Sequence, residues 1–279
     1  MTITLDALAR ASGTFLMVAM DQRESLRTML RDHGHDPTDE RVARFKQAVA
    51  RELAAFASGL LIDKDHAEAV APLVPRGLML AVDRLQQEPG EIVEDTELDE
   101  DVDPPPSAVA LKLLVIWRDD DQRARRREMS ERFAAFARRR GLLSVLEPVV
   151  RAERREEAIV EAARELGPTG CDLYKCEVPT HGEGTDDEIT AWSQRIDEAL
   201  PCPWVVLSQG VAPERYPTAV AAACRGGASG MLAGRAVWAA TLPADDPTEL
   251  LREHSVPRLR ELAEIVDAHG RSWREKRVA

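Results

Sequence analysis

Two lysines stand inside apolar segments of this 279-residue chain, Lys175 in CDLYKCEVP and Lys112 in ALKLLVIW. Lysine occurs only five times among 37 basic residues, and the others are arginine. A desolvated lysine can lose its proton and act as an amine nucleophile, whereas arginine stays charged. The two positions therefore predict amine chemistry, with Lys175 as the nucleophile and Lys112 favouring its neutral form or binding a substrate oxygen. The alternative is that each lysine forms a structural ion pair, Lys175 with Glu177 for example.

Two carboxylates each stand at the end of an apolar segment. Glu147 ends LLSVLE within LLSVLEPVV, and Asp21 closes FLMVAMD. A carboxylate beside an apolar core suits general acid–base chemistry, although each could instead cap a loop or helix. Buried charges are costly unless they are paired. Two lysines and two carboxylates at the ends of four strands therefore indicate an active site more than a stabilising arrangement.

A third group of residues has the chemistry of an anion site. The segment WVVLSQG carries Ser208 and Gly210, and GMLAGRAVW carries Gly234 and Arg235. Backbone N–H groups at the glycines can approach phosphate oxygens, and a guanidinium adds a bidentate contact. The six histidines and four cysteines show no metal-ligand spacing, so we expect no metal and no other cofactor.

These residues need a fold that brings strand ends together. Short apolar segments alternate with longer segments of helical period, which predicts βα units and a parallel sheet. The predicted strands are 15–20, 59–63, 77–82, 109–117, 142–149, 171–178, 204–208 and 229–234, and the predicted helices are 38–57, 119–140, 154–166, 186–200, 213–225 and 250–269.

Eight such strands predict a single domain over residues 1–279, an α/β fold of the (β/α)₈ TIM-barrel type, with a doubly wound open sheet as the alternative. In a barrel the active site lies at the carboxyl ends of the strands, and phosphate often binds after strands seven and eight. The acidic, proline-bearing stretch 83–107 is interpreted as a long exposed connection after the third strand.

The amino-acid composition indicates which kinds of partner the protein is unsuited to bind. The net charge of −12 argues against nucleic acid or an anionic membrane, although a local site can still bind an anion. The chain has no apolar run of about 18 residues, and its N-terminus lacks the pattern of a signal peptide. The four cysteines form no C-x-x-C pair, which is typical of a reduced, cytoplasmic protein.

Several motifs together resemble one family. The motifs are similar to those of the class I aldolases that include tagatose-1,6-bisphosphate aldolase and sulfofructosephosphate aldolase, and the similarity extends over about residues 10–240. The motif sequences are closer to sulfofructosephosphate aldolase. The motifs are MVAMDQRESLRTML, ALKLLVIWR, VLEPVVR, CDLYKCEVP, WVVLSQGV and LAGRAVW. The resemblance implies a (β/α)₈ barrel and a lyase that cleaves a ketose phosphate, such as 6-deoxy-6-sulfofructose 1-phosphate or tagatose 1,6-bisphosphate, to dihydroxyacetone phosphate and an aldehyde. It also implies a metal-independent homo-oligomer.

The same resemblance implies roles for individual residues. Lys175 would form the imine with the ketose C2 carbonyl, Lys112 would assist carbinolamine chemistry, and Glu147 would move protons. Asp21 would orient Lys175 and the substrate hydroxyls, and Gln22 and Arg23 would face the substrate. The anion would be bound by Ser208, Gly210, Gly234 and Arg235.

The chain departs from these relatives in three connections, RAERREEAI, residues 63–70 and the acidic loop. These loops shape the far end of the substrate pocket, so they leave open whether the distal group is phosphate, sulfonate or uncharged. Two other functions compete with the aldolase. One is a sugar-phosphate isomerase or epimerase with Glu147 as base, and the other is a sugar-phosphate-binding protein without turnover.

Overall fold

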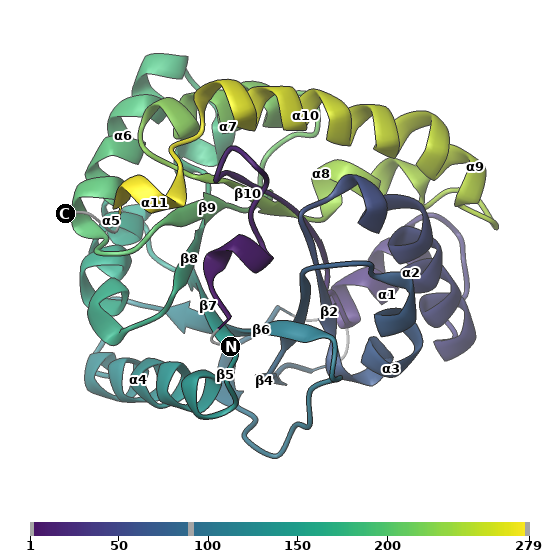
Figure 1. Ribbon diagram of the computed structural model, residues 1–279, viewed down its shortest axis with the longest axis horizontal. Coiled ribbons are helices and arrows are strands. Elements are labelled where there is room, and N and C mark those ends of the chain that lie inside the picture. Colours follow the sequence, from purple (N-terminus) through teal and green to yellow (C-terminus); the bar gives the residue numbers. More distant parts are fainter. Residues whose placement is uncertain (1–2, 89–91, 277–279) are drawn as a thin grey trace.

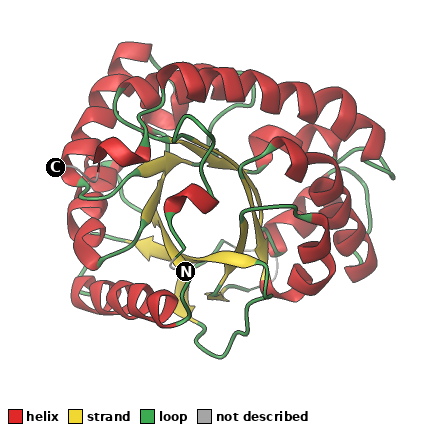
Figure 2. Cartoon of the chain, in the orientation of Figure 1, coloured by secondary structure: helices red, strands yellow, loops and turns green. Residues whose placement is uncertain are grey.

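The computed structural model describes residues 3–88 and 92–276. Its centre is a closed ring of eight parallel strands surrounded by helices (Figures 1 and 2). In ring order the strands are β1 (Phe15–Met20), β10 (Gly230–Ala233), β9 (Trp204–Val206), β8 (Leu173–Cys176), β7 (Leu143–Val150), β6 (Ala108–Trp117), β3 (Leu78–Ala81) and β2 (Gly59–Asp63). The closed ring confirms the (β/α)₈ barrel and excludes the open sheet.

The strands form where the sequence has apolar runs because both faces of a barrel wall are buried. Every residue of β1, β2, β3, β7, β8, β9 and β10 is buried. The longest pairing joins β6 and β7, from Ala110↔Leu143 to Trp117↔Val150. This long shared ladder fixes the relative height of the side chains that β6 and β7 direct into the barrel.

The helices cover the outside of the ring. They are α1 (Glu24–Asp32), α2 (Asp39–Leu53), α3 (Ala67–Val70), α4 (Arg123–Arg139), α5 (Arg155–Leu166), α6 (Asp186–Ala199), α7 (Tyr216–Arg225), α8 (Arg235–Trp238), α9 (Thr248–Leu250), α10 (Val256–His269) and α11 (Trp273–Lys276). All six predicted helices are present, with ends shifted by a few residues. The last one is α9, a π-helical turn (Leu251–Ser255) and α10 in succession.

Local sequence explains where these helices begin. Thr185 caps α6 through a reciprocal capping box with Glu188, and Thr38 caps α2 by accepting a hydrogen bond from the backbone N–H of Arg41. On α4, Phe133 and Phe136 are buried against the barrel. The helices therefore contribute an apolar face to the core and leave their charged face to solvent.

The interpretation of residues 83–107 as a long exposed connection is only partly correct. The segment forms an antiparallel hairpin of β4 (Asp83–Gln86) and β5 (Asp95–Leu98), and the described part of it contains no helix. Asp83, Thr96 and Asp99 are buried, and the Thr96 hydroxyl donates to the Leu114 carbonyl of β6 at 2.7 Å. Residues 89–91 of the acidic stretch lie outside the described residues.

Ion pairs explain why an acidic segment packs here. Asp95 contacts Arg125 at 2.6 Å, and Glu100 contacts Arg132 at 2.6 Å, both on the arginine-rich α4. The acidic hairpin and the basic helix therefore neutralise one another along one side of the barrel.

A short 3-10 turn, η1 (Leu5–Ala7), lies across the middle of the ring in Figure 1. Leu5 and Leu8 pack there with Phe15 and Met17 of β1, in an apolar cluster separate from the one under the helices. The N-terminal segment thus closes the amino end of the barrel, so the interior opens at the carboxyl ends of the strands. No helix among residues 3–88 and 92–276 has the length and apolar character to span a bilayer.

Candidate active site

A cavity of about 610 Å³ opens at the carboxyl ends of the barrel strands. It is lined by all ten residues that the sequence singled out: Asp21, Gln22, Arg23, Lys112, Glu147, Lys175, Ser208, Gly210, Gly234 and Arg235. This is the position at which barrel enzymes carry their chemistry. The structure therefore brings the predicted residues to one site, and the next question is which of them contact each other.

Glu147 connects the two lysines. Its Oε1 lies 2.6 Å from Lys175 Nζ, and its Oε2 lies 2.8 Å from Lys112 Nζ. All three side chains are at least 90% buried in side-chain terms. The register of the sheet produces this arrangement, since β7 lies between β6, which carries Lys112, and β8, which carries Lys175.

Lys112 is held by two further carboxylates, Asp21 at 2.7 Å and Asp83 at 3.3 Å. Burial opposes its charge, but Asp21, Asp83 and Glu147 outweigh burial and raise the pKa of Lys112 well above its ordinary value. Lys112 therefore stays an ammonium ion. It can donate hydrogen bonds to an oxygen of a bound molecule, but it is poorly suited to act as the nucleophile.

Asp21 is correspondingly held as a carboxylate. Burial would raise the pKa of Asp21, but Lys112 and Lys175 lower it, with a further contribution from Arg23. Because Asp21 directly follows β1 at the mouth of the barrel, it can accept hydrogen bonds from Lys112, which it contacts, and from a molecule bound in the cavity.

Lys175 has a single carboxylate partner in the described chain, Glu147. The alternative pairing with Glu177 is wrong. The Glu177 carboxylate accepts from the backbone N–H of Val150 at 2.8 Å and contacts Arg155 at 3.3 Å. The reason is that β8 ends at Cys176, so Glu177 lies beyond the strand and turns toward β7 and α5. A buried lysine with one potential proton acceptor has the surroundings that an imine-forming amine requires.

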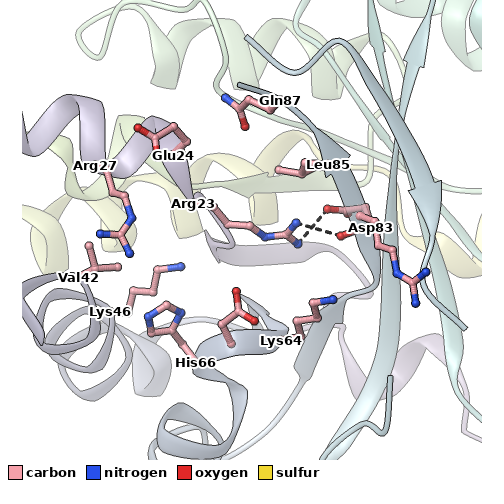
Figure 3. A pocket seen from close by; sticks show the side chains of 12 residues that line it. Arg23, Glu24, Arg27, Val42, Lys46, Lys64, His66, Asp83, Leu85 and Gln87 are labelled. Atoms are coloured by element: carbon pink, nitrogen blue, oxygen red, sulfur yellow. Dashed lines mark hydrogen bonds and ion pairs between the residues drawn. The ribbon is translucent and has the colours of Figure 1, made fainter. Parts of the chain in front are cut away.

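Arg23 is fixed by Asp83. Its guanidinium donates to the Asp83 carboxylate at 3.0 Å and to the Asp83 carbonyl at 2.9 Å, and Figure 3 shows the guanidinium pointing at Asp83. Asp83 also accepts from the backbone N–H of Leu114 at 3.2 Å. Sequence reasoning missed Asp83 because it was included in the acidic connection. The signal was present, since Asp83 follows an apolar strand just as Asp21 does.

The predicted anion site lies on the neighbouring ends of β9 and β10. Ser208 is buried and accepts a long hydrogen bond of 3.5 Å from the backbone N–H of Ala236. A Cβ at Gly234 would lie 2.4 Å from the Ala19 carbonyl oxygen, so only glycine fits between β10 and β1. Gly210 adopts a φ of +78°, which also favours glycine.

Two polar groups at this rim lack partners. The Gln22 side-chain oxygen is buried and accepts no hydrogen bond, and Arg235 has no carboxylate partner within the described ranges. Burial lowers the pKa of Arg235, while Glu147 and Asp21 oppose that shift. An unsatisfied buried acceptor costs free energy, so the Gln22 oxygen points to a ligand, and the partly buried guanidinium of Arg235 offers a cation to such a ligand.

Burial of a lysine is not by itself a functional signal in this chain. Lys46 of α2 is fully buried and pairs with Asp63, which also contacts His66 at 2.7 Å. Lys46 and His66 line a smaller side pocket of about 370 Å³, and Figure 3 shows these two side chains on the far side of Arg23 from Asp83. Here the lysine and carboxylate satisfy each other, so Lys46 is a structural ion pair.

The chemistry available is therefore that of amines, carboxylates and an anion site. Across residues 3–88 and 92–276, no three histidine, cysteine, aspartate or glutamate side chains are arranged to hold a metal ion. The carboxylates of the cavity face ammonium and guanidinium groups instead.

Comparisons with known proteins agree with this geometry. The chain matches tagatose 1,6-diphosphate aldolase 2 of Streptococcus pyogenes serotype M1 with 27% identity, over 99% of this chain and 100% of the relative. It matches tagatose 1,6-diphosphate aldolase 1 of Streptococcus mutans with 24% identity, over 98% of this chain and 97% of the relative. These matches bear out the resemblance to tagatose-bisphosphate aldolases, whereas the closer similarity to sulfofructosephosphate aldolase stays a prediction.

Solved structures with the same fold include a fructose-bisphosphate aldolase from Plasmodium falciparum, with a TM-score of 0.71 and 15% identity over 95% of this chain and 93% of that one. An archaeal fructose-1,6-bisphosphate aldolase, whose catalytic lysine is bound to a carbinolamine intermediate, has a TM-score of 0.61 and 18% identity over 94% of this chain and 98% of that one. At such low identity these structures show the fold alone.

The model of the DeoC/LacD family aldolases matches residues 15–240, which span the barrel from the first strand to the end of α8. This match confirms, at the level of the family, the expectation of a class I ketose-phosphate aldolase. The chain belongs to the DeoC/LacD family of aldolases and is a lyase.

Proposed function

We propose that this chain cleaves a ketose phosphate through a Schiff base on Lys175, releasing dihydroxyacetone phosphate and an aldehyde. The observation that carries the proposal is the different pairing of the two lysines around Glu147. Lys112 contacts three carboxylates and keeps its proton, whereas Lys175 contacts a single carboxylate of the described residues, Glu147. Tagatose 1,6-bisphosphate and 6-deoxy-6-sulfofructose 1-phosphate are the substrates we favour, and the names of the relatives support the first.

The first half of the reaction forms the imine. Lys175 Nζ passes a proton to Glu147 and attacks the C2 carbonyl of the ketose to give a carbinolamine. Glu147 returns a proton to the carbinolamine hydroxyl, which leaves as water, and the protonated imine remains. Lys112, as an ammonium ion, stabilises the oxygen that develops negative charge at C2.

The second half breaks the carbon–carbon bond. Glu147 accepts the proton of the C4 hydroxyl, the C3–C4 bond breaks, and its electron pair enters the imine to form an enamine. The aldehyde leaves, C3 takes up a proton, and water hydrolyses the imine to release dihydroxyacetone phosphate and Lys175. Arg235, Ser208 and the backbone at Gly210 and Gly234 hold the C1 phosphate, which keeps C2 beside the amine.

Asp21, Gln22 and Arg23 complete the proposed site. Asp21 orients Lys175 and the sugar hydroxyls, and the Gln22 side-chain oxygen accepts a hydrogen bond from a sugar hydroxyl. Arg23, held by Asp83, lines the cavity. We also propose, from the composition and the family, that the protein acts in the cytoplasm and as a homo-oligomer.

Borohydride trapping tests the function. The protein is incubated with tagatose 1,6-bisphosphate or fructose 1,6-bisphosphate, reduced with sodium borohydride and mapped by mass spectrometry. We expect a reduced three-carbon phosphate adduct on Lys175, and none on the Lys175→Met variant. The matched control is Lys276→Met in α11, on an element that does not line the cavity, which should be trapped like wild type.

Product formation that proceeds while Lys175 stays unmodified would disprove the mechanism. Release of triose phosphate from the ketose phosphate separates the aldolase from an isomerase or epimerase. Full loss of activity in EDTA, with recovery on adding a divalent metal, would establish a metal-dependent aldolase instead.

A further inference from the structure

Four carboxylates line the catalytic cavity, and each already contacts a cation. Asp21, Asp83 and Glu147 pair with Lys112, Arg23 and Lys175 as described above, and Glu24 pairs with Arg31 at 3.0 Å. Five cations line the same cavity, and only two of them, Arg235 and Arg151, have no carboxylate partner in the described chain. Arg235 belongs to the predicted anion site, but nothing so far explains Arg151.

Arg151 directly follows β7 and continues its inward face. Glu147, Val149 and Arg151 alternate along the chain, and all three line the cavity. Four residues of extended chain span about 13 Å, so the backbone of Arg151 lies at the mouth, above Glu147. Its side chain is half-buried, and its Nε is buried without a hydrogen bond. Within residues 3–88 and 92–276, the guanidinium makes one hydrogen bond, a long one of 3.5 Å to the Val150 carbonyl.

The other two arginines of this connection differ from Arg151, because each of them pairs with a carboxylate. Arg154 pairs with Glu157 at 3.0 Å, and Arg155 pairs with Glu177 at 3.3 Å. The whole chain carries a net charge of −12, so carboxylates are abundant. A half-buried guanidinium without a counter-ion costs free energy unless a ligand supplies the missing charge.

The order of the strands places the two free arginines at the two ends of a path over Lys175. Around the ring, Arg235 follows β10, Ser208 follows β9, Lys175 lies on β8, and Glu147 and Arg151 belong to β7 and its end. Three strand spacings separate β10 from β7, about 14 Å along the ring. A six-carbon sugar with its first anion at Arg235 and its carbonyl at Lys175 would therefore extend toward Arg151.

We propose that Arg151 binds a second anionic group, a phosphate or a sulfonate at the far end of the ketose, and so selects substrates that are charged at both ends. The proposal rests on the function proposed above, since it assumes a ketose phosphate with C2 at Lys175. It decides a question that the sequence left open, because an uncharged distal group would leave Arg151 without a partner. Both anions offer oxygens with the geometry that a guanidinium binds in bidentate fashion.

A matched set of substrates tests the proposal. The kcat/KM values are measured for fructose 1-phosphate, fructose 1,6-bisphosphate and 6-deoxy-6-sulfofructose 1-phosphate, and for the corresponding tagatose mono- and bisphosphate. Wild type should prefer the doubly charged member of at least one series by ten-fold or more. Arg151→Gln should reduce that preference at least ten-fold, mainly through KM. If the substrate with a distal phosphate has the higher kcat/KM, the second anion is a phosphate; if the substrate with a distal sulfonate has the higher value, it is a sulfonate.

Two variants give the comparison its controls. Arg154→Gln lies on the same connection but is exposed and does not line the cavity, so it should keep the wild-type preference. Arg235→Gln should lower kcat/KM for singly and doubly charged substrates alike, because both carry the C1 phosphate. Arg151→Lys, which keeps the charge without the bidentate fork, should retain part of the preference.

A binding measurement gives a readout without turnover. Calorimetry with fructose 1,6-bisphosphate compares Lys175→Met with the Lys175→Met/Arg151→Gln double variant, and we expect affinity to fall at least ten-fold in the double variant. Wild type without a preference in either series, or an Arg151→Gln variant that weakens all substrates equally, would overturn the proposal. Either result could occur while borohydride still traps Lys175, so this failure is distinguishable from failure of the proposed function.

Discussion

Lys112 and Lys175 approach the same carboxylate from its two oxygens, Lys112 at Glu147 Oε2 and Lys175 at Oε1. A proton on Glu147 would weaken both contacts at once. A proton that leaves Lys175 therefore has one nearby carboxylate acceptor among the described residues, and the other oxygen of that carboxylate contacts Lys112. The two lysines have the same side chain but different surroundings. Lys112 contacts three described carboxylates and Lys175 contacts one, so we assign them different roles.

The first prediction concerns Glu147→Gln. The amide keeps the size of the side chain but cannot accept a proton, so kcat should fall about 10²- to 10³-fold. The rate of borohydride trapping on Lys175 should fall in parallel. The control is Glu177→Gln, which removes a buried carboxylate of the neighbouring strand end that contacts neither lysine. Equal effects of the two variants on kcat would remove Glu147 from its role.

The second prediction concerns the stability of Lys112→Met. Removing the ammonium leaves Asp21, Asp83 and Glu147 buried beside one another, which should lower the free energy of unfolding by about 3–5 kcal/mol at neutral pH. In wild type the pKa of Asp21 is lowered on folding, so its contribution is present above its ordinary value of 3.8 and is lost as the pH falls below it. The difference between variant and wild type should therefore shrink toward low pH.

Urea unfolding at a series of pH values measures this effect. Lys46→Met offers a comparison, because Lys46 is also fully buried but faces Asp63 outside the cavity. It should be destabilised as well, yet its folded fraction should still be trapped by borohydride. A Lys112→Met protein as stable as wild type at neutral pH would show that the three carboxylates do not need the ammonium.

The third prediction concerns acid stability at Asp99. Burial works against the charge of Asp99, but hydrogen bonds from Arg84 and Lys64 lower its pKa from 3.8 to about 2. A lowered folded-state pKa stabilises the protein above pH 3.8, and this stabilisation is lost as the pH falls from there to about 2. Asp99→Asn should therefore be less stable at neutral pH and lose less stability on acidification.

Thermal unfolding across that pH range is the measurement, and Asp101→Asn is the control. Asp101 also contacts Arg84, but its side chain is 89% exposed. We expect the control to follow the wild-type acid profile closely. Identical profiles for Asp99→Asn and wild type would show that Asp99 does not contribute.

The fourth prediction concerns Gly234→Ala. The added Cβ would lie 2.4 Å from the Ala19 carbonyl, so β1 and β10 must separate at the point where Asp21 and Arg235 follow them. We expect a loss of about 1–3 kcal/mol in stability and a raised KM for the ketose phosphate. Gly141→Ala is the control, since its φ of +69° is strained for alanine but its Cβ would meet no atom within 4 Å. Only the Gly234 variant should change KM, and a normal KM there would contradict the close approach.

The sequence predicts the barrel well because its strands are continuous apolar segments and its helices have a clear period. It also predicts which side chains share the cavity. Asp21, Lys112, Glu147 and Lys175 are charged residues within or just after apolar strands, and the carboxyl ends of parallel strands converge. Local sequence is sufficient for these statements, since they depend only on where each strand lies and how far along it a residue stands.

Three features were beyond local sequence. The partner of Lys175 is Glu147 rather than the nearer Glu177, because pairing depends on the register between strands. Asp83 was hidden in an acidic segment whose order depends on ion pairs with α4, more than twenty residues away. Arg151 stands among arginines of the same connection, and only the structure shows that it faces the cavity while Arg154 faces solvent.

The hairpin of β4 and β5 occupies the place where a helix would usually follow the third barrel strand. A single residue, Val82, separates β3 from β4. Asp83 is the first residue of the hairpin, and its carboxylate forms an ion pair with the Lys112 ammonium. Insertion of one residue before Val82 would bring Val82 to the position of Asp83, and deletion of one residue would bring Arg84 there. The length of a loop usually varies among homologues. At this junction a change in length would place a cation or a methyl group against Lys112. We therefore expect the length of the junction to be invariant among active homologues.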